Sequence, residues 1–178
     1  MKKTILIPVL TILCMALLLF DLSFGLKNVA KANAEAEQLK IMQTLLPGSK
    51  VFTPEEYTGE DTNIHAVYSA ENGCVIETVT AGYAGEITML IGVSNEGKVT
   101  GLVVRELNET MGLGANALND HKFLSQFLNT SGEAEVGTNV DAITGATVTS
   151  KAITRCVNSA VAYVTGADID SGATSWGG

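Results

Sequence analysis

The stretch that decides the fold is Ile64-His-Ala-Val-Tyr-Ser-Ala-Glu-Asn-Gly-Cys-Val-Ile-Glu-Thr-Val-Thr-Ala81. Two runs with strand-like composition flank Glu71-Asn-Gly73 in its middle. An Asn-Gly pair tolerates the positive φ angles that a tight turn needs. The pattern therefore predicts a β-hairpin with strands at Ile64–Ala70 and Cys74–Ala81.

The segments that follow extend this hairpin into a larger sheet. Ile87, Met89, Ile91 and Val93 alternate with smaller or polar residues, as in a strand. Asn95-Glu-Gly-Lys98 then turns the chain, and Val99–Glu106 returns as a further strand. Together these runs predict an antiparallel meander of four strands.

Helical patterns flank the predicted meander on both sides. Val29–Leu46 has helix-favouring composition and a partial apolar stripe, and Pro47-Gly48 ends it. Thr53-Pro-Glu-Glu56 has the form of a capping box and predicts a single helical turn. A polar loop is expected at Tyr57–Thr62.

Two more helices are predicted after the meander. Asn108–Ala115 contains two glycines and is expected to be a loop, after which Asp120 caps a short helix. Thr130–Asn139 is an irregular link. The last helix, which ends at Val164, has an apolar face of Ile153, Cys156, Val157, Ala160, Val161 and Val164. The expected fold class is α+β, with packed helices against an antiparallel sheet.

The N-terminus carries an apolar run. Lys2-Lys3 precedes Ile5–Phe20, which contains no charge before Asp21. A membrane span needs about 20 apolar residues, so one transmembrane helix is predicted, with its N-terminus in the cytoplasm and the domain outside. A cleavable signal peptide is the alternative, since Ala30-Lys-Ala32 and Ala32-Asn-Ala34 fit a cleavage site. The expected division is an anchor at 1–26, a stalk helix at 27–48, a domain at 49–165 and a flexible tail at 166–178.

Composition and motifs exclude several classes of function. The formal net charge of −8 argues against nucleic acid, whose phosphates need a basic surface. His65 and His121 lack metal-ligand spacing, and the three cysteines form no C-x-x-C. No motif typical of a hydrolase or of a nucleotide-binding loop occurs. No metal site and no independent catalytic site are expected.

Asp141-Ala-Ile-Thr-Gly-Ala-Thr-Val-Thr-Ser150 is the candidate functional stretch. It holds five hydroxyl or carboxyl side chains and directly precedes the pattern of the last helix. The start of a helix has unpaired N–H groups and a positive dipole end, which together favour a bound phosphate. The residues alone leave a simpler alternative open, because Thr and Ser are also common helix caps.

Several motifs, taken together, resemble one family. Asp141-x-x-Thr144-Gly-Ala-Thr147 resembles the acceptor motif of flavin transferases, which attach FMN through its phosphate to the last threonine. Gly82-Tyr-Ala-Gly-Glu-Ile87 and Asn108-Glu-Thr-Met-Gly-Leu-Gly-Ala115 resemble segments of the FMN-binding domain in the G subunit of Rnf-type electron-transport complexes. The same domain occurs in the C subunit of the sodium-pumping NADH:quinone reductase. Leu45-Leu-Pro-Gly48 after a single N-terminal span fits as well.

The resemblance implies a set of FMN contacts. Thr147 would carry covalent FMN, and Asp141 would be recognised by the flavin transferase. The phosphate and its surroundings would involve Thr144, Gly145, Ala146, Thr149 and Ser150. The glycine loop, through Glu109, Thr110, Leu113 and Gly114, would approach the isoalloxazine ring.

The resemblance also implies a function. The chain would be a membrane-anchored electron-transfer subunit that works with other membrane subunits, in a complex that passes electrons between ferredoxin and NAD and translocates ions. A stand-alone exported FMN shuttle and an anchored non-redox binding domain are the alternatives. The chain departs from the family pattern at Met111, where the family usually has proline. Asp168-Ile-Asp-Ser-Gly-Ala-Thr174 repeats the acceptor pattern, but no helix pattern follows it, so Thr147 is the expected site.

Overall fold

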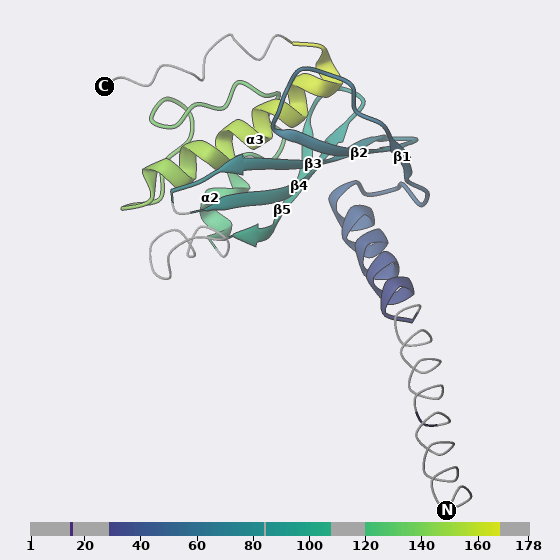
Figure 1. The fold of residues 1–178 in the computed structure, drawn as a ribbon. Helices are drawn as coiled ribbons and strands as arrows, with labels where there is room; N and C mark the ends of the chain where they lie inside the picture. Colours follow the sequence, from purple (N-terminus) through teal and green to yellow (C-terminus); the bar gives the residue numbers. More distant parts are fainter. Residues whose placement is uncertain (1–14, 16–28, 84, 108–119, 168–178) are drawn as a thin grey trace, which may run out of the picture. The chain divides into compact units, whose positions relative to one another are not determined.

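The computed structural model describes residues 15, 29–83, 85–107 and 120–167. Contacts within the chain divide it into two units, Met1–Lys40 and Ile41–Gly178. The second unit is an α+β domain that combines an antiparallel sheet with helices, as predicted (Figure 1). Helical residues run from 29 to 45, in agreement with the predicted helix at Val29–Leu46.

The sheet has five strands in the order in which they occur along the chain. Each strand pairs antiparallel with the next. The strands are β1 (Thr53–Glu55), β2 (Ile64–Ala70), β3 (Gly73–Ala81), β4 (Glu86–Ser94) and β5 (Val99–Leu107). The predicted meander is confirmed as β2 to β5. The hairpin turn is one residue shorter than expected, because Gly73 already pairs with Ala70.

One face of the sheet packs against the last helix. Side chains of consecutive strand residues point to opposite faces, so partners in register lie on the same face. Val67, Ile76, Ile91 and Leu102 are in register across β2 to β5. The first three belong to the main core, and Leu102, which is partly buried, packs against it. Helix α3 (Thr147–Thr165) covers this face with Ile153, Cys156, Val157 and other buried residues.

The opposite face packs against the end of the helix at 29–45. Met42, Leu45 and Leu46 form a second core cluster with Val75 and Leu90. Thr100 Oγ1 donates a hydrogen bond of 2.5 Å to the Leu45 carbonyl oxygen. The residues from Ile41 onward therefore pack on the sheet as part of the second unit.

Helix α2 (His121–Ser125) follows the predicted cap. The Phe123 N–H donates a hydrogen bond of 3.0 Å to the Asp120 carboxylate. Phe123 and Phe127 are buried, and their rings meet edge to face with centroids 5.3 Å apart. The helix is short, and the chain at 126–140 connects it to the motif at 141–150 through turns.

The predicted helical turn at Thr53–Glu56 is wrong. Thr53–Glu55 forms strand β1, in register with Ser69, Tyr68 and Val67. The capping-box pattern with its proline does not distinguish the two structures. A strand at the edge of a sheet also tolerates proline, which has no N–H to donate. Here the strand pairing outweighs the local helix signal.

Some predictions lie outside the described residues. The anchor at 1–26 is described only at Met15, and neither the glycine loop at 108–115 nor Thr174 is described. Within the described ranges, no helix is long and apolar enough to cross a membrane.

Candidate functional site

The motif at 141–150 leads into α3, and the contacts of α3 show at which end of the sheet this helix begins. Farther along the helix, Asn63 Nδ2 donates a hydrogen bond of 3.2 Å to Ser159 Oγ. At its far end, Thr165 lies against Gly97 in the turn between β4 and β5. Helix α3 therefore begins at the other end of the sheet, where β3 ends and β4 begins, as Figure 1 shows.

The turn between β3 and β4 and the last residue of β5 lie at this same end of the sheet. Gly82 N–H donates a hydrogen bond of 2.7 Å to Gly85 O in the turn between β3 and β4. Ile87 pairs with Leu107, the last residue of β5. Leu107 and the start of α3 therefore lie at the same end of the domain.

The side chains of the motif divide into exposed and buried sets. Asp141, Thr144, Gly145 and Thr147 are exposed. The side chains of Thr149 and Ser150 are turned into the domain, where they are 1% and 0% exposed, and Ala146 is 6% exposed.

The N-cap position of α3 is occupied by Ala146, whose methyl group cannot accept a hydrogen bond. Alanine is a poor N-cap, whereas threonine at this position would be a good one. Thr147 instead is the first helical residue, with an exposed side chain. The alternative that the hydroxyls of this motif serve as the helix cap is therefore not supported by the residue that occupies the cap.

Ser150 fixes the loop before α3 through hydrogen bonds to Ile143 and Ala146. Its Oγ donates a hydrogen bond of 2.9 Å to Ala146 O and accepts one of 3.1 Å from the Ile143 N–H. The Ser150 N–H also donates to Ala146 O, at 2.9 Å. The hydroxyl and the N–H of Ser150, a residue predicted to lie at the phosphate, are thus used inside the domain. Between Ile143 and Ala146, Gly145 has φ +79°, a value that favours glycine.

Gln126 holds the start of the motif. Its Nε2 donates a hydrogen bond of 3.2 Å to Asp141 O, and its Oε1 accepts one of 2.8 Å from the Asp141 N–H. The motif is therefore fixed at Asp141, at Ile143 and at the start of α3. No local sequence pattern identifies Gln126, because the contact joins residues 15 positions apart.

The electrostatics at the start of α3 favour an anion. The first turn contains no acidic residue. Lys151 is exposed and lies one turn after Thr147, so it projects on the same side of the helix. The positive end of the helix dipole adds to this field.

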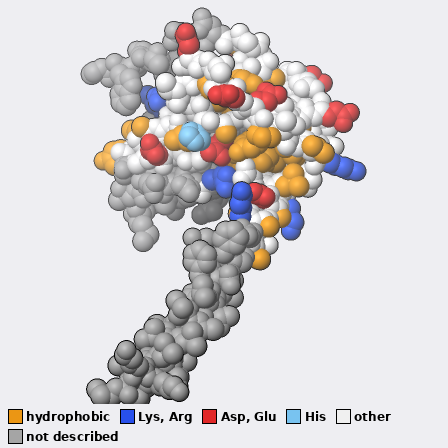
Figure 2. All heavy atoms as spheres, turned by 45° about the vertical axis from the view of Figure 1, so that its right-hand side comes forward, with side chains coloured by type: hydrophobic (Ala, Val, Ile, Leu, Met, Phe, Trp, Pro, Cys, Tyr) orange, Lys and Arg blue, Asp and Glu red, His pale blue; other side chains and the backbone are white. Residues whose placement is uncertain are grey.

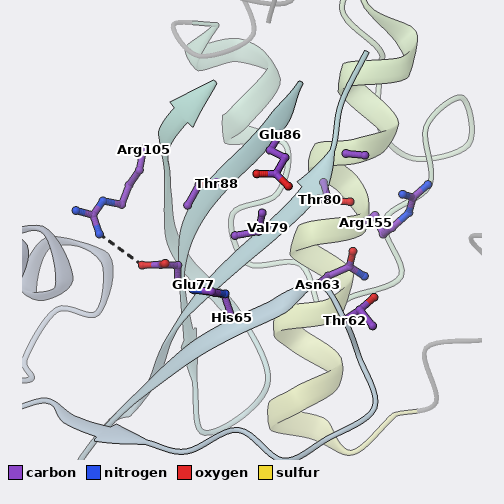
Figure 3. Close-up of a pocket in the computed structure, with 11 residues that line it drawn as sticks. Thr62, Asn63, His65, Glu77, Val79, Thr80, Glu86, Thr88, Arg105 and Arg155 are labelled. Atoms are coloured by element: carbon purple, nitrogen blue, oxygen red, sulfur yellow. Dashed lines mark hydrogen bonds and ion pairs between the residues drawn. The ribbon is translucent and has the colours of Figure 1, made fainter. Parts of the chain in front are cut away.

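A polar hollow of about 780 Å³ lies near the same end of the sheet (Figure 3). Glu77 and Arg105 form an ion pair of 3.5 Å at its wall, and Arg155 reaches it from α3. The other lining residues are Thr62, Asn63, His65, Val79, Thr80, Ala81, Glu86 and Thr88. None of the predicted FMN contacts that the structure describes lines this hollow.

The cysteines and histidines show no site of their own among the described residues. Cys156 is fully buried on α3, and burial raises the pKa of its thiol to about 11. Cys74 is half-buried, and burial likewise raises the pKa of its thiol. His65 and His121 are exposed, and the described residues contain no group of three or more metal-ligating side chains.

The visible surface carries both signs of charge. Figure 2 shows acidic and basic side chains spread among hydrophobic and uncharged polar ones, with no broad basic area in the part of the chain that it colours.

A comparison with protein families identifies the domain. The model of the FMN-binding domain matches residues 82–162. The match includes β4, β5, α2 and most of α3, and with them the whole motif at 141–150.

The G subunit of an ion-translocating oxidoreductase complex from Methanosarcina acetivorans is 35% identical over 147 residues, which cover 73% of this chain and 77% of the relative. The chain belongs to this family of G subunits. The G subunit of the Na⁺-translocating ferredoxin:NAD⁺ oxidoreductase complex of Acetobacterium woodii is 34% identical over 144 residues, or 73% of this chain. Its counterpart in the proton-translocating ferredoxin:NAD⁺ oxidoreductase complex of Clostridium ljungdahlii is 39% identical over 110 residues, or 55% of this chain. The chain spans 66% and 59% of the length of these two relatives.

The residues of this member of the G-subunit family fit the phosphate of FMN. Thr147 supplies an exposed hydroxyl that can form an ester, and the start of α3 supplies N–H donors for the remaining phosphate oxygens. No acidic residue in the first turn opposes the charge of the phosphate. This donor set agrees with the FMN-binding domain that the family match identifies.

Proposed function

We propose that this chain is a membrane-anchored electron-transfer subunit that carries FMN bound covalently to Thr147. The observation that carries the proposal is the start of α3. Ala146 occupies the N-cap, and the Thr147 hydroxyl stands exposed at a helix start that has no side-chain cap. A phosphodiester would keep one negative charge, which the helix dipole and Lys151 stabilise.

The residues of the motif then have distinct roles. Thr147 holds the phosphate as an ester, and the N–H groups around Val148 donate to its free oxygens. Thr144 supplies a further hydroxyl, and Gly145 leaves room beside the ester. Buried Ser150 keeps the loop in place. The glycine loop, through Glu109, Thr110, Leu113 and Gly114, approaches the ring of the flavin.

The bound flavin would supply the redox chemistry, and the protein supplies its position and its electrostatic surroundings. The relatives' names place comparable G subunits in ferredoxin:NAD⁺ oxidoreductase complexes that translocate Na⁺ or protons. The same setting is proposed for this chain, with other membrane subunits as its electron donor and acceptor. A covalent link prevents loss of FMN from a domain outside the cytoplasm.

The apolar run at 1–26 would anchor the domain in the cytoplasmic membrane, with Lys2 and Lys3 inside. Protease treatment of intact spheroplasts tests this topology. The domain should be digested while a tag on the N-terminus stays protected. A mature chain that starts near Ala32 or Ala34 would show instead that the segment is a cleaved signal peptide.

The intact mass of the purified full-length chain tests the covalent link. The wild-type protein should carry the added mass of one FMN, with flavin fluorescence that persists on a denaturing gel. Thr147→Ala should abolish both signals, and Thr174→Ala, which removes the last residue of the second motif, should leave both unchanged. Fluorescence that survives Thr147→Ala and disappears in Thr174→Ala would contradict the assignment.

Purification in mild detergent tests the proposed partners. The tagged chain should retain membrane subunits with several spans, together with bound FMN. A flavin-carrying chain that purifies alone from native membranes would favour the stand-alone shuttle. A wild-type chain without any flavin would favour the non-redox alternative.

A further inference from the structure

The side-chain amide of Gln126 binds both backbone groups of Asp141. The two hydrogen bonds, of 3.2 Å to Asp141 O and 2.8 Å from the Asp141 N–H, reproduce the pattern that one strand residue makes with another. Asp141 has an exposed side chain and is the first residue of the acceptor motif. We call this pair of hydrogen bonds the Gln126 clamp.

The clamp fixes one end of a short segment whose other end is also fixed. Thr147 follows Asp141 after one short turn of chain, and the Ser150 hydroxyl holds Ile143 between them. Thr147 itself is part of α3. With both ends held, the backbones of Asp141 and Thr147 keep a constant separation on the surface of the folded domain.

An enzyme that modifies Thr147 needs this constant separation if it also binds Asp141. A mobile acceptor loses conformational freedom when the enzyme binds it, which weakens binding. A preorganised acceptor has already lost that freedom on folding. The clamp itself stays at the rim of the domain, so it holds Asp141 without contributing to the buried core.

We propose that Gln126 is a positioning residue for flavin attachment, which acts through Asp141 to present Thr147 to the flavin transferase. This inference rests on the proposed function of Thr147. It implies that the transferase takes the folded domain as its substrate.

The transfer needs an activated flavin phosphate, such as the pyrophosphate of a flavin dinucleotide. Thr147 Oγ1 forms a new bond to the flavin-side phosphorus, and the phosphorus–oxygen bond of the pyrophosphate bridge breaks. A nucleoside monophosphate leaves, and the hydroxyl proton passes to a base of the transferase. No electrons are gained or lost. Gln126 touches none of the reacting atoms.

The chain contains a matched control for the clamp. Asn158 Nδ2 donates a hydrogen bond of 2.9 Å to Ala134 O, and Asn158 Oδ1 accepts one of 3.2 Å from the Ala134 N–H. This second amide binds the backbone of a loop outside the acceptor motif in the same two-way manner. Asn158→Ala therefore removes a similar pair of hydrogen bonds, part-buried where those of Gln126 are exposed, without releasing Asp141.

The experiment measures flavin transfer to the full-length chain, produced without the transferase and purified in detergent. Purified transferase and flavin dinucleotide are added, and in-gel flavin fluorescence is followed at several concentrations of the chain. Gln126→Ala should lower kcat/KM about tenfold, mainly through KM, because it removes two hydrogen bonds of moderate strength. Gln126→Glu keeps the acceptor for the Asp141 N–H but loses the donor to Asp141 O, so it should also fall below wild type. Asn158→Ala should match wild type.

Thermal unfolding of the same variants separates positioning from stability. Gln126→Ala and Asn158→Ala should lower the melting temperature by similar amounts. A kcat/KM for Gln126→Ala equal to that of wild type would overturn the clamp inference. An equal loss in Asn158→Ala would also overturn it, because general destabilisation would then explain the effect. A wild-type chain that accepts no flavin, or a Thr147→Ala chain that still accepts it, would instead overturn the proposed function and the inference with it.

Discussion

Gly92 lies directly under the backbone of Leu45, so close that a methyl group on Gly92 would overlap the Leu45 carbonyl oxygen. Gly101, its partner on β5, is also close, since an added Cβ would lie 3.0 Å from Leu45 Cα. Because neither glycine has a side chain, the backbone at Leu45 can approach the sheet closely at these two positions. Thr100 then binds the same carbonyl oxygen through its hydroxyl.

Gly92→Ala should therefore destabilise the domain strongly. The methyl group would meet backbone atoms, which cannot move aside as the tip of a side chain can. Overpacking in a core typically costs about 1–3 kcal/mol, and we expect the upper part of this range. Urea denaturation of the two proteins measures the difference in unfolding free energy. Thr88→Ala on the same strand is the control, because Thr88 lines the open hollow, and it should change stability by less than about 1 kcal/mol.

The sheet was largely predictable because its signals are local. The hairpin at β2 and β3 follows from a turn between two apolar runs, and the burial of Ile87, Met89, Ile91 and Val93 follows from their alternation. Strand β1 was not predictable, because Thr53–Glu55 carries a helix-start pattern and becomes a strand only by pairing with β2. The close contact between Leu45 and Gly92 could not be predicted either, since it joins residues far apart in the sequence.

Some features of the candidate site could also be predicted from local sequence, and others could not. The position of Thr147 at the start of a helix followed from the apolar spacing that comes after it, and the structure agrees. The burial of the Ser150 side chain could not be predicted from the sequence. A hydroxyl at the start of a helix can form hydrogen bonds either to a ligand or to the protein backbone. Gln126 carried no signal, since its two hydrogen bonds depend on how the chain after α2 packs beside the motif.

Phe127→Ala should cost about 3–5 kcal/mol of unfolding free energy, since Phe127 is fully buried and packs edge to face on Phe123. Chemical denaturation monitored by circular dichroism measures this loss. Leu128→Ala, at the adjacent and 42% exposed position, is the matched control. A control loss as large as that of Phe127→Ala would show that the described packing of this segment is wrong.

Cys156 should make stability depend on alkaline pH. Burial raises the pKa of its thiol from 9.0 to about 11 in the folded protein. Between these values the folded state binds the proton more tightly than the unfolded state does, so unfolding free energy falls as pH rises. The loss reaches about 2 kcal/mol at pH 11 and approaches about 3 kcal/mol above it, because one pKa unit corresponds to about 1.4 kcal/mol.

Urea titrations from pH 8 to 11 test this dependence by comparing wild type with Cys156→Ala. The variant lacks the thiol, so its stability should fall less steeply above pH 9, even if its stability at pH 8 is lower. Subtracting the two curves removes the contributions of the lysines and tyrosines that titrate in the same range. Parallel curves would mean that the folded thiol ionises at its ordinary pKa.

Ser150→Ala should destabilise the domain more than Thr154→Val does. Both residues are buried on α3, and each hydroxyl donates to a backbone carbonyl one turn earlier. Only the Ser150 hydroxyl is also seen to accept a hydrogen bond, from the Ile143 N–H in the acceptor loop. Removing that acceptor leaves a part-buried N–H without its partner, which costs about 1–3 kcal/mol. Thr154→Val keeps the shape of the side chain and should cost less than about 1.5 kcal/mol.

Hydrogen exchange distinguishes loss of the Ser150 hydrogen bond from general loosening of α3. In Ser150→Ala the Ile143 amide should exchange faster, while amides in the middle of the helix keep their protection. In Thr154→Val the Ile143 amide should exchange as in wild type. Equal acceleration at Ile143 in both variants would show that the loop is held by the helix as a whole and that the Ser150 hydroxyl has no separate role.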